Sequence, residues 1–138
     1  MPKRKRPALP PAHDWRARDL DDWNATTFAA YLADRHEDIF GIKYVAGNNV
    51  ARERAMLKRM IDEYGPEVTR RFIDACLAEY KPTTQYPGVS FTFMYSYMRA
   101  RVLPRVLAEV QREQAMARAV AKTIGLTDEQ ADEIIGLL

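Results

Sequence analysis

The 138-residue sequence is poor in the residues from which sites of chemistry are built. Its one cysteine, Cys76, excludes an internal disulfide bond and suits a reducing compartment. The two histidines, His13 and His36, are too far apart in the chain to form the paired-histidine motif of a helical zinc site. The six glycines are scattered singly, so no phosphate-cradling loop is present. We therefore expect no cofactor, no metal and no enzymatic activity.

Long hydrophobic runs are also missing. No apolar stretch approaches the length of a membrane span, and the basic N-terminus leads into Pro7, Pro10 and Pro11 instead of the apolar core of a signal peptide. With 47% hydrophobic and 29% charged residues, the composition is that of a folded globular protein. These features predict a cytoplasmic protein that does not associate with membranes.

The formal net charge of +2 hides an uneven distribution. Four consecutive cations occupy the N-terminus, whereas the C-terminal segment carries four acidic residues and no cation: Lys3, Arg4, Lys5 and Arg6, against Asp128, Glu129, Asp132 and Glu133. We accordingly divide the chain into a basic, proline-rich arm (1–22), a helical domain (23–126) and an acidic amphipathic helix (127–138). Most of the arm is expected to be mobile or ordered only on a partner.

The spacing of apolar residues after the arm predicts helices throughout. Gly65 ends one helix and Pro66 is suited to the first position of the next, so the chain should change direction sharply there. Near the C-terminus, Thr127 and Gln130 fit a capping box that starts the last helix. The expected fold is all-α, a single compact domain of five to six helices, with helices near 26–37, 49–65, 66–80, 91–124 and 128–138.

The aromatic segment 91–98 is compatible with either a helix or a strand. As a strand, Phe91, Phe93, Tyr95 and Tyr97 would alternate with smaller residues, but a lone strand among helices has no partner for its backbone hydrogen bonds. We favour a helix capped by Ser90, which Pro104 either breaks or kinks. Its buried face would comprise Phe91, Met94, Tyr95, Met98 and Val102, leaving Phe93 and Tyr97 as the only rings free to meet a partner.

Two sets of cations are candidate binding residues. Lys3–Arg6 can lie along phosphates, although a solubilising tail has the same composition. On a continuous helix, Arg101, Arg105 and Arg112 fall within about 40° of one another, and Arg52 and Arg59 are seven residues apart on an earlier helix. These arginines can contact phosphates or an acidic protein surface, or they can form an ordinary solvated face.

Other chemically suggestive residues have simpler structural explanations. Cys76 lies on the apolar face of its helix, where a buried small hydrophobic role is expected. His36-Glu37-Asp38 is expected to be the fraying polar end of a helix rather than an acid–base or metal cluster. Gly47-Asn48-Asn49 is typical of a turn followed by a helix cap.

Several core and turn motifs occur in a characteristic order: Phe28-x-x-Tyr31-Leu32, Lys58–Gly65, Phe72-Ile73-Asp74, Tyr86-Pro87-Gly88 and Leu103-Pro104. In this order, over roughly residues 23–107, the chain resembles small helical proteins encoded by phages and prophages, many from DNA-replication or early-gene modules. The resemblance implies an accessory role near DNA in a bacterial host cell. It carries no active-site motif to transfer.

The leading hypothesis is a non-enzymatic accessory protein that associates with DNA, without sequence specificity, through the arm and the arginine-bearing faces. The alternative is an inhibitor or adaptor that binds a host nucleic-acid enzyme through the same arginines or the last helix. A homo-oligomer formed through the C-terminal helix is a further possibility.

Overall fold

A computed structural model describes residues 8–47 and 49–137, and the described part is entirely helical, without a strand. The fold class predicted from the sequence is therefore confirmed, but the number of helices is not. Across these residues four helices form the framework: α1 (Ala25–Phe40), α2 (Val50–Glu79), α4 (Arg99–Thr123) and α5 (Asp128–Leu137). Three short helical segments complete it: η1 (Leu20–Asp22), α3 (Phe91–Phe93) and η2 (Met94–Met98).

The helix count differs because α2 continues across the joint predicted at Gly65. Gly65 has φ 86° and ψ 167°, a conformation open essentially only to glycine, and the helical hydrogen-bonding pattern resumes at Pro66. The Thr69 hydroxyl donates to the Gly65 carbonyl at 2.8 Å, which adds a side-chain hydrogen bond across the joint. The change of direction is thus real, but it lies within a single kinked helix.

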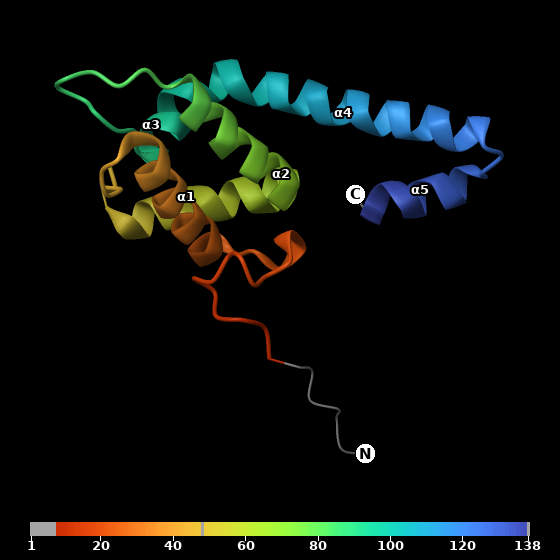
Figure 1. The fold of residues 1–138 in the computed structure, drawn as a ribbon, viewed down its shortest axis with the longest axis horizontal. Coiled ribbons are helices and arrows are strands. Elements are labelled where there is room, and N and C mark those ends of the chain that lie inside the picture. Colours follow the sequence, from red (N-terminus) through yellow and green to blue (C-terminus); the bar gives the residue numbers. More distant parts are fainter. Residues whose placement is uncertain (1–7, 48, 138) are drawn as a thin grey trace.

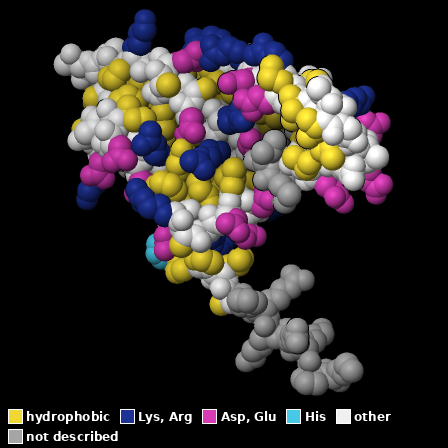
Figure 2. Space-filling model, turned by 45° about the vertical axis from the view of Figure 1, so that its right-hand side comes forward, with side chains coloured by type: hydrophobic (Ala, Val, Ile, Leu, Met, Phe, Trp, Pro, Cys, Tyr) yellow, Lys and Arg dark blue, Asp and Glu magenta, His cyan; other side chains and the backbone are white. Residues whose placement is uncertain are grey.

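The core lies where α1, both halves of α2 and the start of α4 meet (Figure 1). Its fully buried side chains include Phe28, Leu57, Phe72, Phe91 and Val102. Beyond this body α4 projects outward, and α5 folds back beneath it (Figure 1). Figure 2 shows hydrophobic side chains gathered on this projecting lobe. The molecule is therefore a helical body with a two-helix extension.

The aromatic segment is helical, as favoured from the sequence. The Ser90 side chain accepts from the backbone N–H of Phe93 at 3.2 Å and caps the segment. The predicted inner face is confirmed, with Phe91, Met94, Met98 and Val102 buried and Tyr95 half-buried. The segment passes through the wider π-helical turn η2 before α4 begins.

Pro104 neither ends nor divides α4, which runs from Arg99 to Thr123. Proline removes the hydrogen bond to the carbonyl four residues earlier. That carbonyl belongs to Ala100, which is exposed. Water can therefore satisfy the group that Pro104 leaves unpaired, and the helix continues.

Part of the segment 8–22 packs against α1. Trp23 is buried, and its indole N–H donates to the Arg18 carbonyl at 3.0 Å. Trp15 donates to Asp34 of α1 at 2.7 Å and packs edge-on against Tyr31, with ring centroids 4.9 Å apart. A mobile arm is thus not confirmed for residues 8–22, while Lys3, Arg4, Lys5 and Arg6 lie outside the described residues.

Within residues 8–47 and 49–137, no helix is both long enough and apolar enough to cross a membrane.

Replacing Gly65 by alanine should lower the free energy of unfolding by about 1–3 kcal/mol, because the backbone conformation is strained for any residue with a Cβ. The added methyl group itself would meet no atom within 4 Å, so the loss reports the backbone alone. Urea unfolding followed by circular dichroism measures it. Gly136→Ala, in α5 and without a positive φ, is the matched control and should leave stability unchanged or slightly raised.

Candidate functional site

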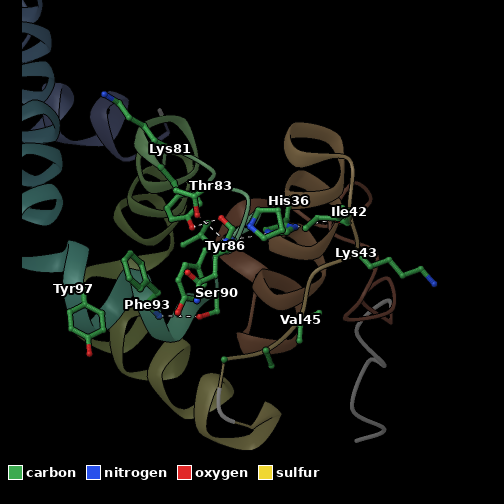
Figure 3. Close-up of a pocket in the computed structure, with 17 residues that line it drawn as sticks. His36, Ile42, Lys43, Val45, Lys81, Thr83, Tyr86, Ser90, Phe93 and Tyr97 are labelled. Atoms are coloured by element: carbon green, nitrogen blue, oxygen red, sulfur yellow. Dashed lines mark hydrogen bonds between the residues drawn. The ribbon is translucent and has the colours of Figure 1, made fainter.

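An open pocket of about 880 Å³ lies between two loops of the described surface. Its walls are the loop after α1 (residues 42–47), the segment 80–90 before α3, and two rings, Phe93 and Tyr97 (Figure 3). Among the described residues that line it, two are lysines and none is acidic. Lys43 and Lys81 lie on opposite sides, with their side chains extending outward (Figure 3). The pocket therefore suits an apolar or aromatic group that carries negative charge nearby.

Phe93 and Tyr97 form its aromatic rim. Their side chains are 41% and 75% exposed, and their ring centroids are 5.1 Å apart. Phe93 also meets Tyr80 edge-on at 6.0 Å, so three rings lie in a row. The helix does leave Phe93 and Tyr97 outside the core. They are not the only accessible rings, however, because Tyr86 on the opposite wall is also exposed.

A buried carboxylate holds the pocket walls together. Glu53, in the first turns of α2, is only 5% exposed. It accepts from the backbone N–H of Gly47 at 3.0 Å, and from the backbone N–H and hydroxyl of Thr92 at 3.0 and 2.7 Å. The Tyr44 hydroxyl also donates to it, while accepting from the Phe91 N–H at 2.8 Å. One side chain thus ties the loop after α1 to the start of α3.

Tyr44 stays protonated in this network. Burial raises the pKa of its hydroxyl well above the ordinary value, and the hydrogen bond to the Glu53 carboxylate raises it further. The phenol therefore serves as a fixed hydrogen-bond donor.

Glu53 was not among the functional residues predicted from the sequence. A signal was present: Glu53 lies three residues after Val50 and four before Leu57, within the apolar stripe. A charged residue at such a position is buried only when it has partners. Those partners, Tyr44, Gly47 and Thr92, are brought to it by the tertiary fold.

His36 braces the other side of the pocket, and the expectation that it frays at a helix end is wrong. The ring is buried. Its Nε2 accepts from the Val89 backbone N–H at 3.1 Å, so its Nδ1 carries the proton and donates to the Ile42 carbonyl at 3.2 Å. A Cβ added at Gly88 would come within 2.5 Å of Nε2, which shows how closely segment 80–90 approaches the ring.

Metal binding finds no support at this histidine. Groups of three or more His, Cys, Asp or Glu side chains that could hold a metal ion do not occur within the described part of the chain. The hydrogen bonds of His36 to the Ile42 carbonyl and the Val89 N–H position two loops.

The candidate arginines divide into paired and unpaired residues. Arg101 and Arg105 both turn to Glu79, at 4.0 and 2.5 Å, but keep exposed side chains. Because α4 is continuous through Pro104, Arg101 and Arg105 lie about one turn apart on it, and Arg101 follows Tyr97 of η2 by four residues in the chain. The rim of the pocket therefore leads directly into an arginine stripe.

The remaining arginines lie elsewhere. Arg52 and Arg59 belong to the first half of α2, and Arg112 to the projecting part of α4. All three are exposed, and among the described residues none of them forms an ion pair. No interaction within that part of the chain joins Arg52 and Arg59 to the arginines of α4, so the predicted set does not form one cluster.

Cys76 is buried, as the sequence indicated. Burial raises the pKa of its thiol to about 12, and the Glu79 carboxylate adds to the effect. Since the thiolate is the nucleophilic form, the side chain is unreactive in the folded protein.

Comparisons with known proteins add no relative: no family model, curated protein or solved structure matches the chain.

Removing the buried carboxylate should strongly destabilise the protein. Glu53→Ala leaves the hydroxyl of Tyr44 and the donors of Gly47 and Thr92 without an acceptor, so the free energy of unfolding should fall by about 3 kcal/mol. Glu109→Ala, which removes an exposed glutamate from α4, should change it by less than about 0.5 kcal/mol. Chemical denaturation of both variants tests this, and equal losses would contradict the role of Glu53.

The Cys76 thiol should resist modification in the native protein near neutral pH and react rapidly once the chain unfolds, because both its accessibility and its ionisation are suppressed. Absorbance of a thiol-specific disulfide reagent follows the reaction. As a control, Ala108→Cys in a Cys76→Ala background places a thiol at an exposed position of α4 and should react without denaturant. Fast labelling of native wild-type protein would show that Cys76 is accessible.

Proposed function

We propose that this protein is a non-enzymatic accessory factor that associates with DNA through the aromatic pocket rim and the adjoining cations. The observation that supports this most directly is the pair of exposed, adjacent rings of Phe93 and Tyr97 beside a pocket without acidic residues among its described lining. The arginine stripe begins one turn beyond Tyr97. Many proteins bind single-stranded DNA through this combination of exposed aromatic rings and neighbouring cations.

The rings would take the bases. Aromatic side chains stack on any base, because every base presents a π-face, so such contacts bind without reading sequence. The centroids of Phe93 and Tyr97 are 5.1 Å apart with the ring planes inclined at 43°. They therefore offer two neighbouring stacking surfaces rather than one closed stack.

The cations would take the phosphates. Lys81 flanks the pocket, and Arg101 lies beyond Tyr97 with its side chain 67% exposed and only a 4.0 Å approach to Glu79. Arg105 lies closer to Glu79, at 2.5 Å, and would therefore contribute less to phosphate binding. Arg52, Arg59 and Arg112, together with the N-terminal run Lys3–Arg6, would add long-range attraction that makes binding salt-dependent.

The cellular setting follows from the resemblance to phage-encoded helical proteins. We place the action of this protein in the cytoplasm of a bacterial host, next to DNA that is being replicated or expressed. Its role there would be to bind and present nucleic acid or to modulate another protein that does.

A protein partner is the second candidate, and a different observation favours it. Ile42, Val45 and Tyr86 expose apolar surface around the same pocket. Such a surface would suit an inhibitor or adaptor that receives an apolar side chain of a host nucleic-acid enzyme. Capture from host lysate after nuclease treatment separates the hypotheses: a stoichiometric protein that survives nuclease favours this second role.

The double variant Phe93→Ala, Tyr97→Ala should bind single-stranded DNA about 10- to 100-fold more weakly, since each lost stack is worth about 1–3 kcal/mol. Fluorescence anisotropy with a labelled oligothymidylate measures the affinity. Ile39→Ala, an exposed apolar residue of α1 outside the pocket, should bind like the wild type. Undiminished binding by a folded double variant would remove the rings from the site.

The salt dependence should identify the phosphate contacts. Each lost contact with single-stranded DNA should lower the slope of log affinity against log salt by about 0.7. We therefore expect a shallower slope for Lys81→Ala, Arg101→Ala and for a variant lacking Lys3–Arg6, measured by the same titration. No binding at low salt, or slopes unchanged in all of these variants, would contradict the DNA-binding proposal.

A further inference from the structure

The last residue of α2, Glu79, lies where the aromatic rim meets the arginine stripe. The next residue, Tyr80, lines the pocket, and its ring meets Phe93 edge-on at 6.0 Å. The Glu79 carboxylate turns to α4, where its oxygens lie 2.5 Å from Arg105 and 4.0 Å from Arg101. An acidic side chain therefore faces both arginines that adjoin the rim.

This carboxylate is incompletely satisfied. Its Oε2 atom is shielded from solvent, yet no donor in the described part of the chain is hydrogen-bonded to it. The approach of Arg101 at 4.0 Å is too long for a hydrogen bond. A shielded polar atom without a partner is uncommon in native proteins, because it loses hydration and gains no hydrogen bond in return. The position of Glu79 therefore calls for an explanation other than stability.

Another ion pair between α2 and α4 shows how the two helices are linked structurally. The Arg71 guanidinium donates to both carboxylate oxygens of Glu113, at 3.0 and 2.5 Å. Its side chain is 29% exposed, whereas those of Arg101 and Arg105 are 67% and 55% exposed. Because α2 and α4 have this hydrogen-bonded link and a shared apolar core, their contact does not need the ion pairs of Glu79.

A phosphate group suits the two arginines at least as well as Glu79 does. A phosphodiester carries the same unit charge as a carboxylate, and its oxygens accept hydrogen bonds from the planar fork of a guanidinium. Since Arg101 and Arg105 have exposed side chains, a strand can reach them without opening the core. Replacing the carboxylate by a phosphate would leave each arginine paired with an anion.

We infer that Glu79 is an internal competitor for the phosphates of bound DNA. In the free protein its carboxylate occupies Arg101 and Arg105, and a phosphate takes its place when a strand lies across the rim. Glu79 thereby reduces the share of the affinity that comes from phosphate contacts and leaves a larger share to stacking on the rings. The inference rests on the proposed function, because it assigns the control of that same site.

Fluorescence anisotropy with a labelled oligothymidylate, at one fixed salt concentration, tests the inference. Glu79→Gln should bind about three- to tenfold more tightly than the wild type, because two exposed ion pairs no longer compete with the phosphates. The slope of log affinity against log salt should steepen by up to about 0.7 for each arginine that is released.

Glu109→Gln is the matched control, since it removes the same charge from α4. Glu109 is exposed and forms no ion pair among the described residues. This variant should strengthen binding by less than about twofold, because it changes only the long-range attraction. Both variants should unfold at the same urea concentration as the wild type, since exposed charges contribute little to stability.

A double-mutant cycle separates competition from a structural effect. Arg105→Ala should weaken DNA binding little in the wild type but several-fold in the Glu79→Gln background, since only there is the arginine released. A purely structural role of Glu79 would not make the effect of Arg105→Ala depend on the background in this way.

The outcomes distinguish this inference from the proposed function. If the wild type binds the oligonucleotide and Glu79→Gln binds no more tightly, or Glu109→Gln gains as much, the inference is overturned and the proposed function stands. Equal effects of Arg105→Ala in both backgrounds would overturn the inference as well. If neither the wild type nor Glu79→Gln binds at low salt, the proposed function fails and the inference fails with it.

Discussion

The buried carboxylate of Glu53 is the interaction on which the pocket depends. An ionised side chain removed from water is tolerated only when hydrogen bonds replace its hydration, and Glu53 receives them from the loop after α1 and from the start of α3. In the described part of the chain, neither segment belongs to a strand or to one of the long helices. A single charge in the first turns of α2 thus specifies the relative positions of two loops.

The same network places the aromatic rim. Tyr44 donates to Glu53 and accepts from Phe91, while Ser90 caps the helical segment that presents Phe93. His36 supports the opposite wall through the Ile42 carbonyl and the Val89 N–H. These polar groups are engaged inside, whereas the rings of Phe93, Tyr97 and Tyr86 and the two lysines are exposed around the pocket. An inner polar scaffold is thus separated from an outer aromatic rim in this candidate site.

Much of the local structure could be predicted from the residues alone. The caps at Ser90 and Thr127, the break at Gly65 and the inner face beginning at Phe91 follow from short-range chemistry, and the structure contains them. The predictions that were wrong or are not confirmed concern long-range contacts. His36 was expected at a fraying helix end, but its ring bonds to the carbonyl of Ile42. Residues 8–22 were expected in a mobile arm, but Trp15 bonds to the carboxylate of Asp34. Neither partner can be recognised from the sequence pattern.

What the sequence by itself determined is the helical class, the positions of the caps and the kink, and the inner face of segment 91–102, since each depends on residues within one or two turns of one another. Only the tertiary structure decided that Glu53 and His36 are buried, that Arg101 and Arg105 share Glu79, and that Met116 and Ile124 face outward. These outcomes depend on which distant donor, acceptor or helix lies opposite. Whether a charge or an apolar side chain is stable in the interior depends on its neighbours in space, and only some of those neighbours are also close in the sequence.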